Sequence, residues 1–181
     1  MKKVFTPRRL DPKAFAQEQA LLEGQDPVAG FARLLAETQD GGGARAVTWS
    51  AQGELGNPHH LQPDVWLHLR AQALLPLACQ RCLRAVDLPV EVERSFRFVA
   101  DESMAAAQDD ESEEDVLALS PSFDLLELLE DELLMALPLA PRHETCPGPV
   151  AMQAVDADFE AESARRDNPF ALLGQLKTPK A

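Results

Sequence analysis

Residues 65–98 read VWLHLRAQALLPLACQRCLRAVDLPVEVERSFRF, and this stretch decides the fold. Apolar residues alternate with polar ones on both sides of a central CQRC, which is typical of two β-strands that each bury one face. Leu74 and Pro76 interrupt the alternation of the first half, so this half is either one bent strand or two strands in succession. We predict an antiparallel hairpin whose tip carries Cys79 and Cys82.

The same alternation begins further upstream in the chain. Val47 and Trp49 lie between polar residues, and a group of turn-forming residues follows them at 53–58. We therefore predict β structure throughout residues 44–99.

Residues 11–39 contain two sequence signals for the start of a helix. Asp11-Pro12 and Asp26-Pro27 each place a carboxylate acceptor before a proline that suits the first position of a helix. Gly24 is suited to end the first helix. We predict two helices here, and we expect them to cover the sheet.

Downstream of the sheet the chain changes character twice. Residues 100–120 are acidic and rich in Ala and Ser, with too few large apolar groups to offset the entropy of ordering, so we expect a mobile acidic loop. Residues 122–137 then place leucines at helical spacing, with Asp124 and Glu127 positioned as a capping box and Pro138 as a stop. This segment is predicted to be a helix.

Together these segments predict an α+β fold, with a mainly antiparallel sheet in a single domain over residues 1–146. Residues 147–181 are interpreted as a linker and an extended C-terminal tail. No stretch is long and apolar enough to span a membrane, and the first residues lack the apolar segment of a secretory signal. The odd number of cysteines argues against a secreted disulfide scaffold, so we expect a cytoplasmic protein.

The net charge of −13 is confined to one part of the chain. Between Arg97 and Arg142 there is no Lys or Arg, whereas 13 of the 30 Asp and Glu residues lie there, which leaves 17 acids to balance 17 bases elsewhere. Tight binding to a phosphate backbone needs clustered Lys and Arg, so this pattern favours basic partners instead. The predicted contact residues are Asp109, Asp110, Glu111, Glu113, Glu114 and Asp115.

Two pairs of residues have the spacing of a zinc site. Cys79 and Cys82 form the first pair, and His143 and Cys146 form the second with the same spacing. Structural zinc sites use four Cys or His ligands, often arranged as such pairs, so the first interpretation is a Cys₃His zinc site. The alternative is a buried Cys79 thiol, a Cys82 in a turn and a His143 in a surface loop.

Redox chemistry is a third interpretation of the CxxC pair. A thiol of this kind is activated at a helix N-terminus, but the residues after Cys82 alternate like a strand, which disfavours redox chemistry. The sequence contains no Ser/His/Asp arrangement and no phosphate-binding Gly-rich loop. We therefore expect a protein without enzymatic activity.

Three stretches, in this order, resemble the YceD family of large ribosomal RNA subunit accumulation proteins: LACQRCLRAVDLPVEVERSFRF (77–98), FDLLELLEDELLMALPLAPRHETC (123–146) and NPFALLGQLK (168–177). The resemblance implies a non-enzymatic role in accumulation of large-subunit ribosomal RNA, with ribosome assembly components as partners. Combined with the charge pattern, it leads us to expect a basic protein as the direct partner. Two alternatives stay open: a zinc-bound adaptor unrelated to ribosomes, and a CxxC redox regulator.

Two further groups of residues are candidate contacts. Arg81 and Arg84 at the hairpin tip either touch RNA directly or are scattered surface arginines. The tail either docks back on the domain as a short helix or binds in a partner's groove through one apolar side. The residues on that side are Phe170, Leu172, Leu173 and Leu176.

Overall fold

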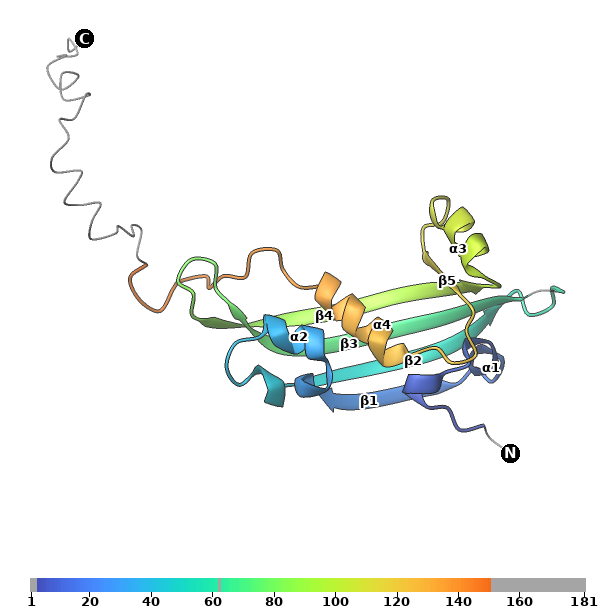
Figure 1. The fold of residues 1–181 in the computed structure, drawn as a ribbon, viewed down its shortest axis with the longest axis horizontal. Coiled ribbons are helices and arrows are strands. Elements are labelled where there is room, and N and C mark those ends of the chain that lie inside the picture. The colour runs from blue at the N-terminus through green and yellow to red at the C-terminus, as the bar shows by residue number, and fades with distance from the viewer. Residues whose placement is uncertain (1–2, 62, 151–181) are drawn as a thin grey trace, which may run out of the picture. The chain divides into compact units, whose positions relative to one another are not determined.

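The computed structural model describes residues 3–61 and 63–150, and within them five strands form one sheet (Figure 1). The strands lie side by side in chain order; the first three pairings are antiparallel and the last is parallel. The α+β prediction with a mainly antiparallel sheet is confirmed. The strands are β1 (Leu21–Pro27), β2 (Ala46–Gly56), β3 (Asp64–Ala78), β4 (Ala85–Val99) and β5 (Asp115–Ala118).

Helices and 3-10 turns connect and cover the strands. The chain divides into two compact units, Met1–Cys146 and Pro147–Ala181, and every helix and strand of the described residues belongs to the first. None of the helices described is both long enough and apolar enough to cross a membrane. The α-helices are α1 (Pro12–Gln17), α2 (Ala32–Glu37), α3 (Glu102–Asp109) and α4 (Leu125–Met135), and the 3-10 turns are η1 (Pro7–Arg9), η2 (Val28–Gly30) and η3 (Gly42–Ala44).

β3 and β4 form the predicted hairpin, and each is a single strand of 15 residues. β2 pairs with β3 only as far as Ala73, so the part of β3 that contains Pro76 has β4 as its only strand neighbour. The carbonyl of Pro76 points away from β4 and accepts a hydrogen bond from the backbone N–H of Gln39 at 2.7 Å. The missing N–H of the proline therefore costs no ladder hydrogen bond.

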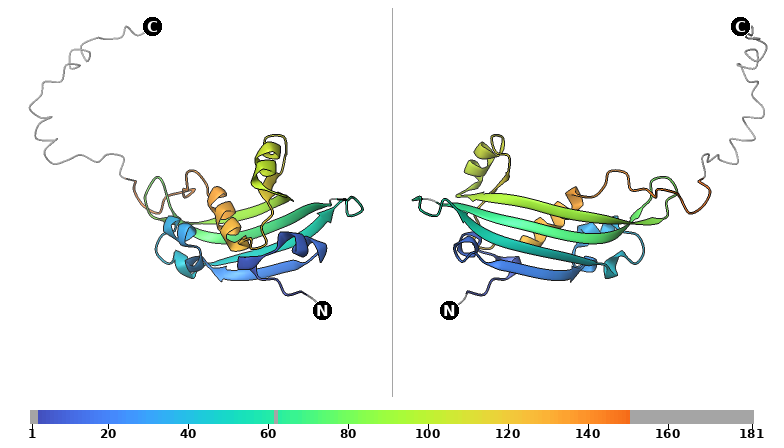
Figure 2. Two further views of the ribbon diagram at one scale, coloured as in Figure 1. Left: turned by 45° about the vertical axis from the view of Figure 1, so that its right-hand side comes forward. Right: turned by 180° about the vertical axis from the view of Figure 1, so that it is seen from behind.

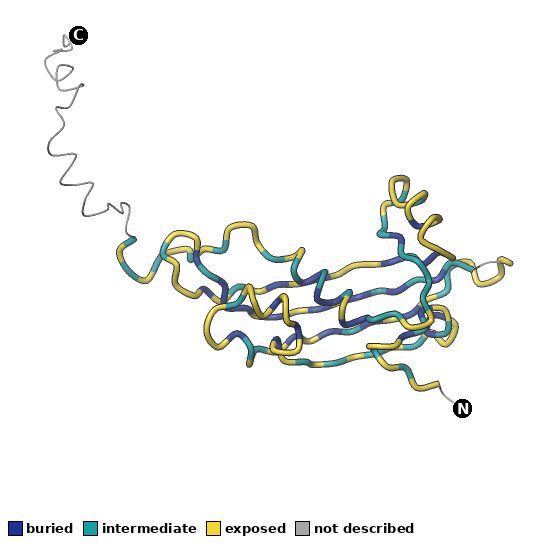
Figure 3. Tube along the Cα trace, in the orientation of Figure 1, coloured by how far each residue is buried: buried dark blue, intermediate teal, exposed yellow. Residues whose placement is uncertain are grey.

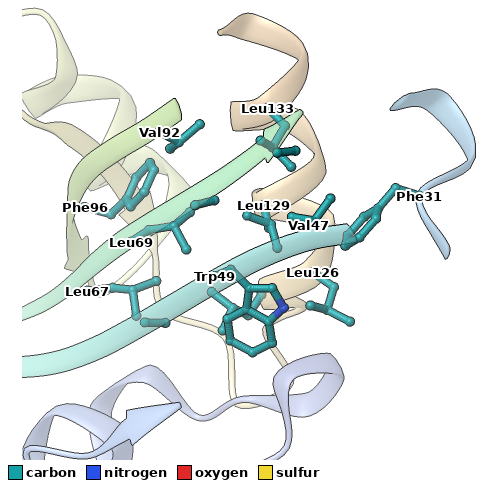
Figure 4. Close-up of a cluster of buried hydrophobic side chains, with 14 of the residues drawn as sticks. Phe31, Val47, Trp49, Leu67, Leu69, Val92, Phe96, Leu126, Leu129 and Leu133 are labelled. Carbon is teal, nitrogen blue, oxygen red and sulfur yellow. The ribbon is translucent and has the colours of Figure 1, made fainter. Parts of the chain in front are cut away.

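α4 supplies the helical side of the core (Figure 4). It lies within the predicted range of 122–137, and the carboxylate of Asp124 caps it by accepting hydrogen bonds from the N–H groups of Leu126 and Glu127 at 2.9 and 3.1 Å. Successive turns of α4 pack leucines against alternate residues of three strands. These contacts include Leu126, Leu129 and Leu133 on the helix and Val47, Trp49, Leu67, Leu69, Val92 and Phe96 on the strands.

The prediction of two helices over residues 11–39 is confirmed in part, because α1 and α2 form there but a strand, β1, lies between them. The Asp11 cap is confirmed, because its side chain accepts a hydrogen bond from the Ala14 N–H at 3.0 Å, but α1 is short and β1 follows it. Asp26 caps no helix, since its carboxylate accepts a hydrogen bond from the Trp49 indole at 2.7 Å. Gly24 lies against the same indole, where a Cβ atom would be 2.5 Å from the ring. The core therefore draws this segment into the sheet.

α2 is the remnant of the second predicted helix, and α4 holds its first turn. Phe31 at the N-cap position offers no side-chain acceptor. The buried carboxylate of Glu130 in α4 takes this role by accepting hydrogen bonds from the backbone N–H groups of Arg33 and Leu34 at 2.7 and 3.1 Å. The Arg33 guanidinium in turn forms ion pairs with Glu130 and Asp131. A cap supplied by another helix satisfies the same N–H groups as a local one.

The prediction of a mobile loop over residues 100–120 is wrong, because α3 and β5 form there. Asp101 caps α3 by accepting a hydrogen bond from the Met104 N–H at 2.9 Å, and β5 pairs with β4. Arg97 of β4 then fastens the segment to the sheet. Its guanidinium donates hydrogen bonds of 2.8 to 2.9 Å to three side chains, those of Gln108, Ser112 and Glu114.

The sheet has a covered face and an open face (Figure 2). α1, α2 and α4 lie on the covered face. Buried and exposed residues alternate along β2, β3 and β4 (Figure 3), and the buried ones form the main core with residues of these helices. Across β1 to β4 the open face is bare of helices in the described part of the chain, and α3 lies at one end of it. There Val99, which has the orientation of the open-face residues of β4, packs with Ala105 and Val116 in a cluster separate from the main core.

Candidate metal centre

The tip of the β3–β4 hairpin positions two of the cysteines. Cys79 directly follows β3, and its N–H donates a hydrogen bond to the carbonyl of Arg84 at 2.9 Å, which closes the loop. Within the loop, the Leu83 N–H donates back to the Cys79 carbonyl at 2.8 Å, and Leu83 takes a left-handed conformation with φ of 58°. This tight turn brings the side chain of Cys82 back toward that of Cys79.

The segment after α4 brings the second pair to the same place. α4 ends before Pro138, and the chain then runs along the hairpin tip, where the Gln80 N–H donates a hydrogen bond to the carbonyl of Pro141 at 2.8 Å. The Arg81 guanidinium donates hydrogen bonds to the carbonyls of His143 and Glu144. These contacts place the HxxC segment beside the CxxC loop.

The four ligand atoms of Cys79, Cys82, His143 and Cys146 lie within 4.8 Å of one another. The Cys82 Sγ and the His143 Nδ1 are 3.5 Å apart. In a tetrahedral zinc site, bond lengths of about 2.3 Å to sulfur and about 2.0 Å to nitrogen place the ligand atoms about 3.5–3.8 Å from each other. The cluster is therefore close to the size of a filled metal site, and the three cysteines are free of disulfides.

The electrostatics of the thiols also suit a cation. Burial by itself raises the pKa of Cys79, but hydrogen bonds from the backbone N–H groups of His143, Arg81 and Cys82 outweigh it and lower the pKa to about 5. Burial raises the pKa of Cys146, and the neighbouring Cys82 and Cys79 sulfurs raise it further. Thiolates this close repel one another, and a bound metal ion removes that repulsion. Three thiols and an imidazole thus fit a metal with all four positions filled by the protein.

The predicted acidic contact residues divide into two groups. Glu114 forms an ion pair with Arg97 at 2.8 Å, and Asp115 forms one with Arg94 at 2.7 Å, so both help to fasten the segment to β4. Arg97 lowers the pKa of Glu114 by hydrogen bonding. The remaining four are exposed and form no ion pair within the described residues: Asp109, Asp110, Glu111 and Glu113.

The two candidate RNA-contact arginines have different surroundings. The Arg81 guanidinium donates hydrogen bonds to carbonyls of the HxxC segment and so positions that segment. The sequence prediction missed this role. No local sequence pattern indicates this role of Arg81, because its hydrogen-bond partners lie some sixty residues away in the chain. Arg84 is exposed and has no ion-pair partner among the described residues. The tail residues Phe170, Leu172, Leu173 and Leu176 lie outside the described residues.

Comparison with known proteins places this cluster in a family context. The family model described as "Large ribosomal RNA subunit accumulation protein YceD" matches residues 67–177, a range that contains all four cluster residues. The chain is also similar to the Large ribosomal RNA subunit accumulation protein YceD of Haemophilus influenzae. The two are 30% identical over 178 residues, which cover 98% of this chain and 99% of the relative. No solved structure matches the chain significantly.

Proposed function

The chain belongs to the YceD family, and we propose that it supports the accumulation of large-subunit ribosomal RNA as a non-enzymatic factor in large-subunit biogenesis. The observation that carries the proposal is the match over nearly the full length to a relative with that name. Such a factor works in the cytoplasm, where bacterial ribosomes are assembled.

The deciding experiment is sedimentation of ribosomal subunits from a strain that lacks the protein. We expect less large-subunit RNA and fewer free and assembled large subunits, with both restored by the wild-type gene. Unchanged large-subunit RNA would exclude the proposal and favour an adaptor unrelated to ribosomes.

The direct partner under this proposal is a basic assembly protein that the acidic end of α3 attracts. The exposed acids there lie close together and lack internal ion pairs, so they are available to Lys and Arg side chains. Charge complementarity of this kind mainly speeds encounter and suppresses wrong partners.

Charge reversal tests this contact without removing α3 or β5. Asp110→Lys with Glu113→Lys should weaken capture of basic ribosomal proteins and flatten the salt dependence of binding. The variant should keep the melting temperature of the wild type, because both side chains are exposed. Equal capture by variant and wild type at low salt would rule out α3 as the contact.

Zinc is the metal proposed for the cluster, and its role is structural. Three thiolates and one imidazole favour zinc, and a site with four protein ligands has no open position for a substrate. Bound there, the ion would link the hairpin tip to the segment that follows α4. Native mass spectrometry should show one zinc ion that is lost on denaturation, whereas a metal-free protein with a Cys79–Cys82 disulfide would support the redox alternative.

A further inference from the structure

The open face of the sheet has a hollow. It lies apart from the metal cluster, and the family description does not indicate what it binds. A hollow of about 850 Å³ lies over β1 to β4. Its outward-pointing side chains are polar and come from all four strands, so the hollow crosses the sheet. They are Glu23, Thr48, Ser50, Arg70, Gln72, Glu91 and Glu93.

The charge of this hollow is negative. Arg70 is its one basic residue, and its guanidinium already donates to the Glu93 carboxylate at 2.7 and 3.1 Å. Glu23 and Glu91 are exposed and form no ion pair within the described residues. Among residues 3–61 and 63–150, therefore, no cation neutralises the two carboxylates, and a cationic ligand would be attracted.

α3 extends the negative charge at one end of the same face. The cluster of Val99, Ala105 and Val116 seats α3 on this side of the sheet rather than on the side of α4. The exposed acids Asp110 and Glu113 at the end of α3 thus border the open face. The hollow and the end of α3 each carry unpaired acids on the same side of the sheet, which disfavours a nucleic acid backbone there.

The dimensions of the hollow suit an α-helix. Four adjacent strands span about 14 Å, since neighbouring strands lie about 4.8 Å apart. A helix with its side chains is about 10–12 Å across. Thr48, Ser50 and Gln72 on the floor offer hydroxyl and amide groups to polar side chains of such a helix.

We propose that the hollow over β1 to β4, with Glu23 and Glu91 as its unpaired carboxylates, binds a Lys- and Arg-rich α-helix of a partner protein. The inference rests on the proposed function for the class of that partner, a basic assembly protein. It assigns binding to a surface separate from the exposed acids of α3.

The test uses the full chain and a fluorescein-labelled Ala/Lys peptide of about 18 residues, long enough to form a helix on its own. Its binding is followed by fluorescence anisotropy. The variant Glu23→Lys with Glu91→Lys should weaken binding about tenfold, because two attractive contacts become repulsive. The control Glu18→Lys with Glu37→Lys changes the net charge equally, but at exposed positions on the covered side, and should weaken binding less than about twofold.

Three outcomes would overturn the inference. Equal weakening in the two variants would mean that the peptide senses only the net charge. Tighter binding of a labelled RNA hairpin than of the peptide, with the RNA displacing the peptide, would make nucleic acid the occupant. A dimer in sedimentation equilibrium that the same variant dissociates would make a second copy of the chain the occupant.

The experiment also separates this inference from the proposed function. If the hollow variant binds the peptide normally while a strain without the protein loses large-subunit RNA, only the assignment of the hollow is wrong. If the peptide results are as expected but that strain keeps its large-subunit RNA, only the proposed function is wrong.

Discussion

The two ends of the β3–β4 ribbon show two ways to fasten a later segment of the chain to a hairpin. At the tip, the thiols and imidazole of the metal cluster bring residues 139–146 to the CxxC loop. At the opposite end, Arg97 and a small apolar cluster hold α3 and β5 against β4. The tip combines the four candidate ligand atoms with a few hydrogen bonds, whereas the other end combines apolar packing with hydrogen bonds.

The difference follows from how much apolar surface each end buries. Around the cluster, Leu83 and Leu139 are 75% and fully exposed, so little apolar burial stabilises the contact between the two segments. At the other end Val99, Ala105 and Val116 are each buried to more than 90%. We therefore expect the proposed metal ion to stabilise the contact at the tip, and the two ends should respond to different perturbations.

Metal removal should have the largest effect, and only at the tip. A strong chelator should lower the free energy of unfolding by about 4 kcal/mol, the stabilisation that a ligand gives at about a thousand times its Kd. Hydrogen exchange should rise at residues 79–84 and 139–146 and stay unchanged in α3. Cys146→Ser is the matched control, because its stability should no longer depend on the chelator. Equal melting of the wild type with and without chelator would contradict the metal-based account of this end.

Arg81→Ala should come second, because Arg81 positions the HxxC segment without being one of the four candidate ligands. Loss of its hydrogen bonds to the His143 and Glu144 carbonyls should lower the metal affinity by about 10-fold or more, as measured by competition with a chromophoric chelator. Arg84→Ala, in the same loop, should leave the affinity unchanged. Equal metal affinities in Arg81→Ala and Arg84→Ala would show that Arg81 does not position the metal ligands.

Arg97→Ala should loosen the opposite end by about 1–2 kcal/mol, because three hydrogen bonds to a largely buried guanidinium are lost. The change should raise hydrogen exchange at residues 102–118 and leave metal content unchanged. Arg70→Ala serves as control, since the Arg70–Glu93 pair is highly exposed and contributes little. If the metal were lost from Arg97→Ala, the two ends would not be independent.

Protonation of Glu114 should produce the smallest of these effects, and it is measured at β5 because acid also protonates the candidate metal ligands at the tip. Arg97 lowers the pKa of Glu114 in the folded protein below the ordinary value of about 4.3. The stabilisation is therefore fully present above that value and is lost as the pH falls through the lower folded pKa. An NMR titration of the β5 amides should show this transition in the wild type. In Arg97→Ala the transition should move back toward the ordinary value, and an unmoved transition would exclude the ion pair as its cause.

Local patterns in the sequence were enough to predict the hairpin, α4 and the group of candidate ligands. Alternation is a direct consequence of strand geometry, and the Asp124 cap is a contact between near neighbours, so both are visible without the fold. The equal spacing of CxxC and HxxC also indicated one site. The two motifs can form one site only if the hairpin tip lies beside the segment after α4. The spacing of the motifs could not show this, and the structure does.

The mistaken predictions share one cause, which is that distant residues overrode a local preference. Asp26 has the sequence signature of a helix cap, yet the Trp49 indole takes its carboxylate. The first turn of α2 lacks a local acceptor, and Glu130 supplies one from a helix almost a hundred residues later. The acidic segment looked mobile because its anchor, Arg97, belongs to the preceding strand.

The sequence by itself determined the α+β class, the alternation of apolar and polar residues in β3 and β4, and which four side chains can act as ligands. These properties arise between residues a few positions apart, where chain geometry alone sets the outcome. Only the tertiary structure decided that β1 and β5 join the sheet, that Arg81 contacts the HxxC segment of the cluster, and that the described helices leave one face of β1 to β4 uncovered. Those properties depend on side chains that meet across the fold, because burial and hydrogen bonding between distant residues can outweigh local propensity.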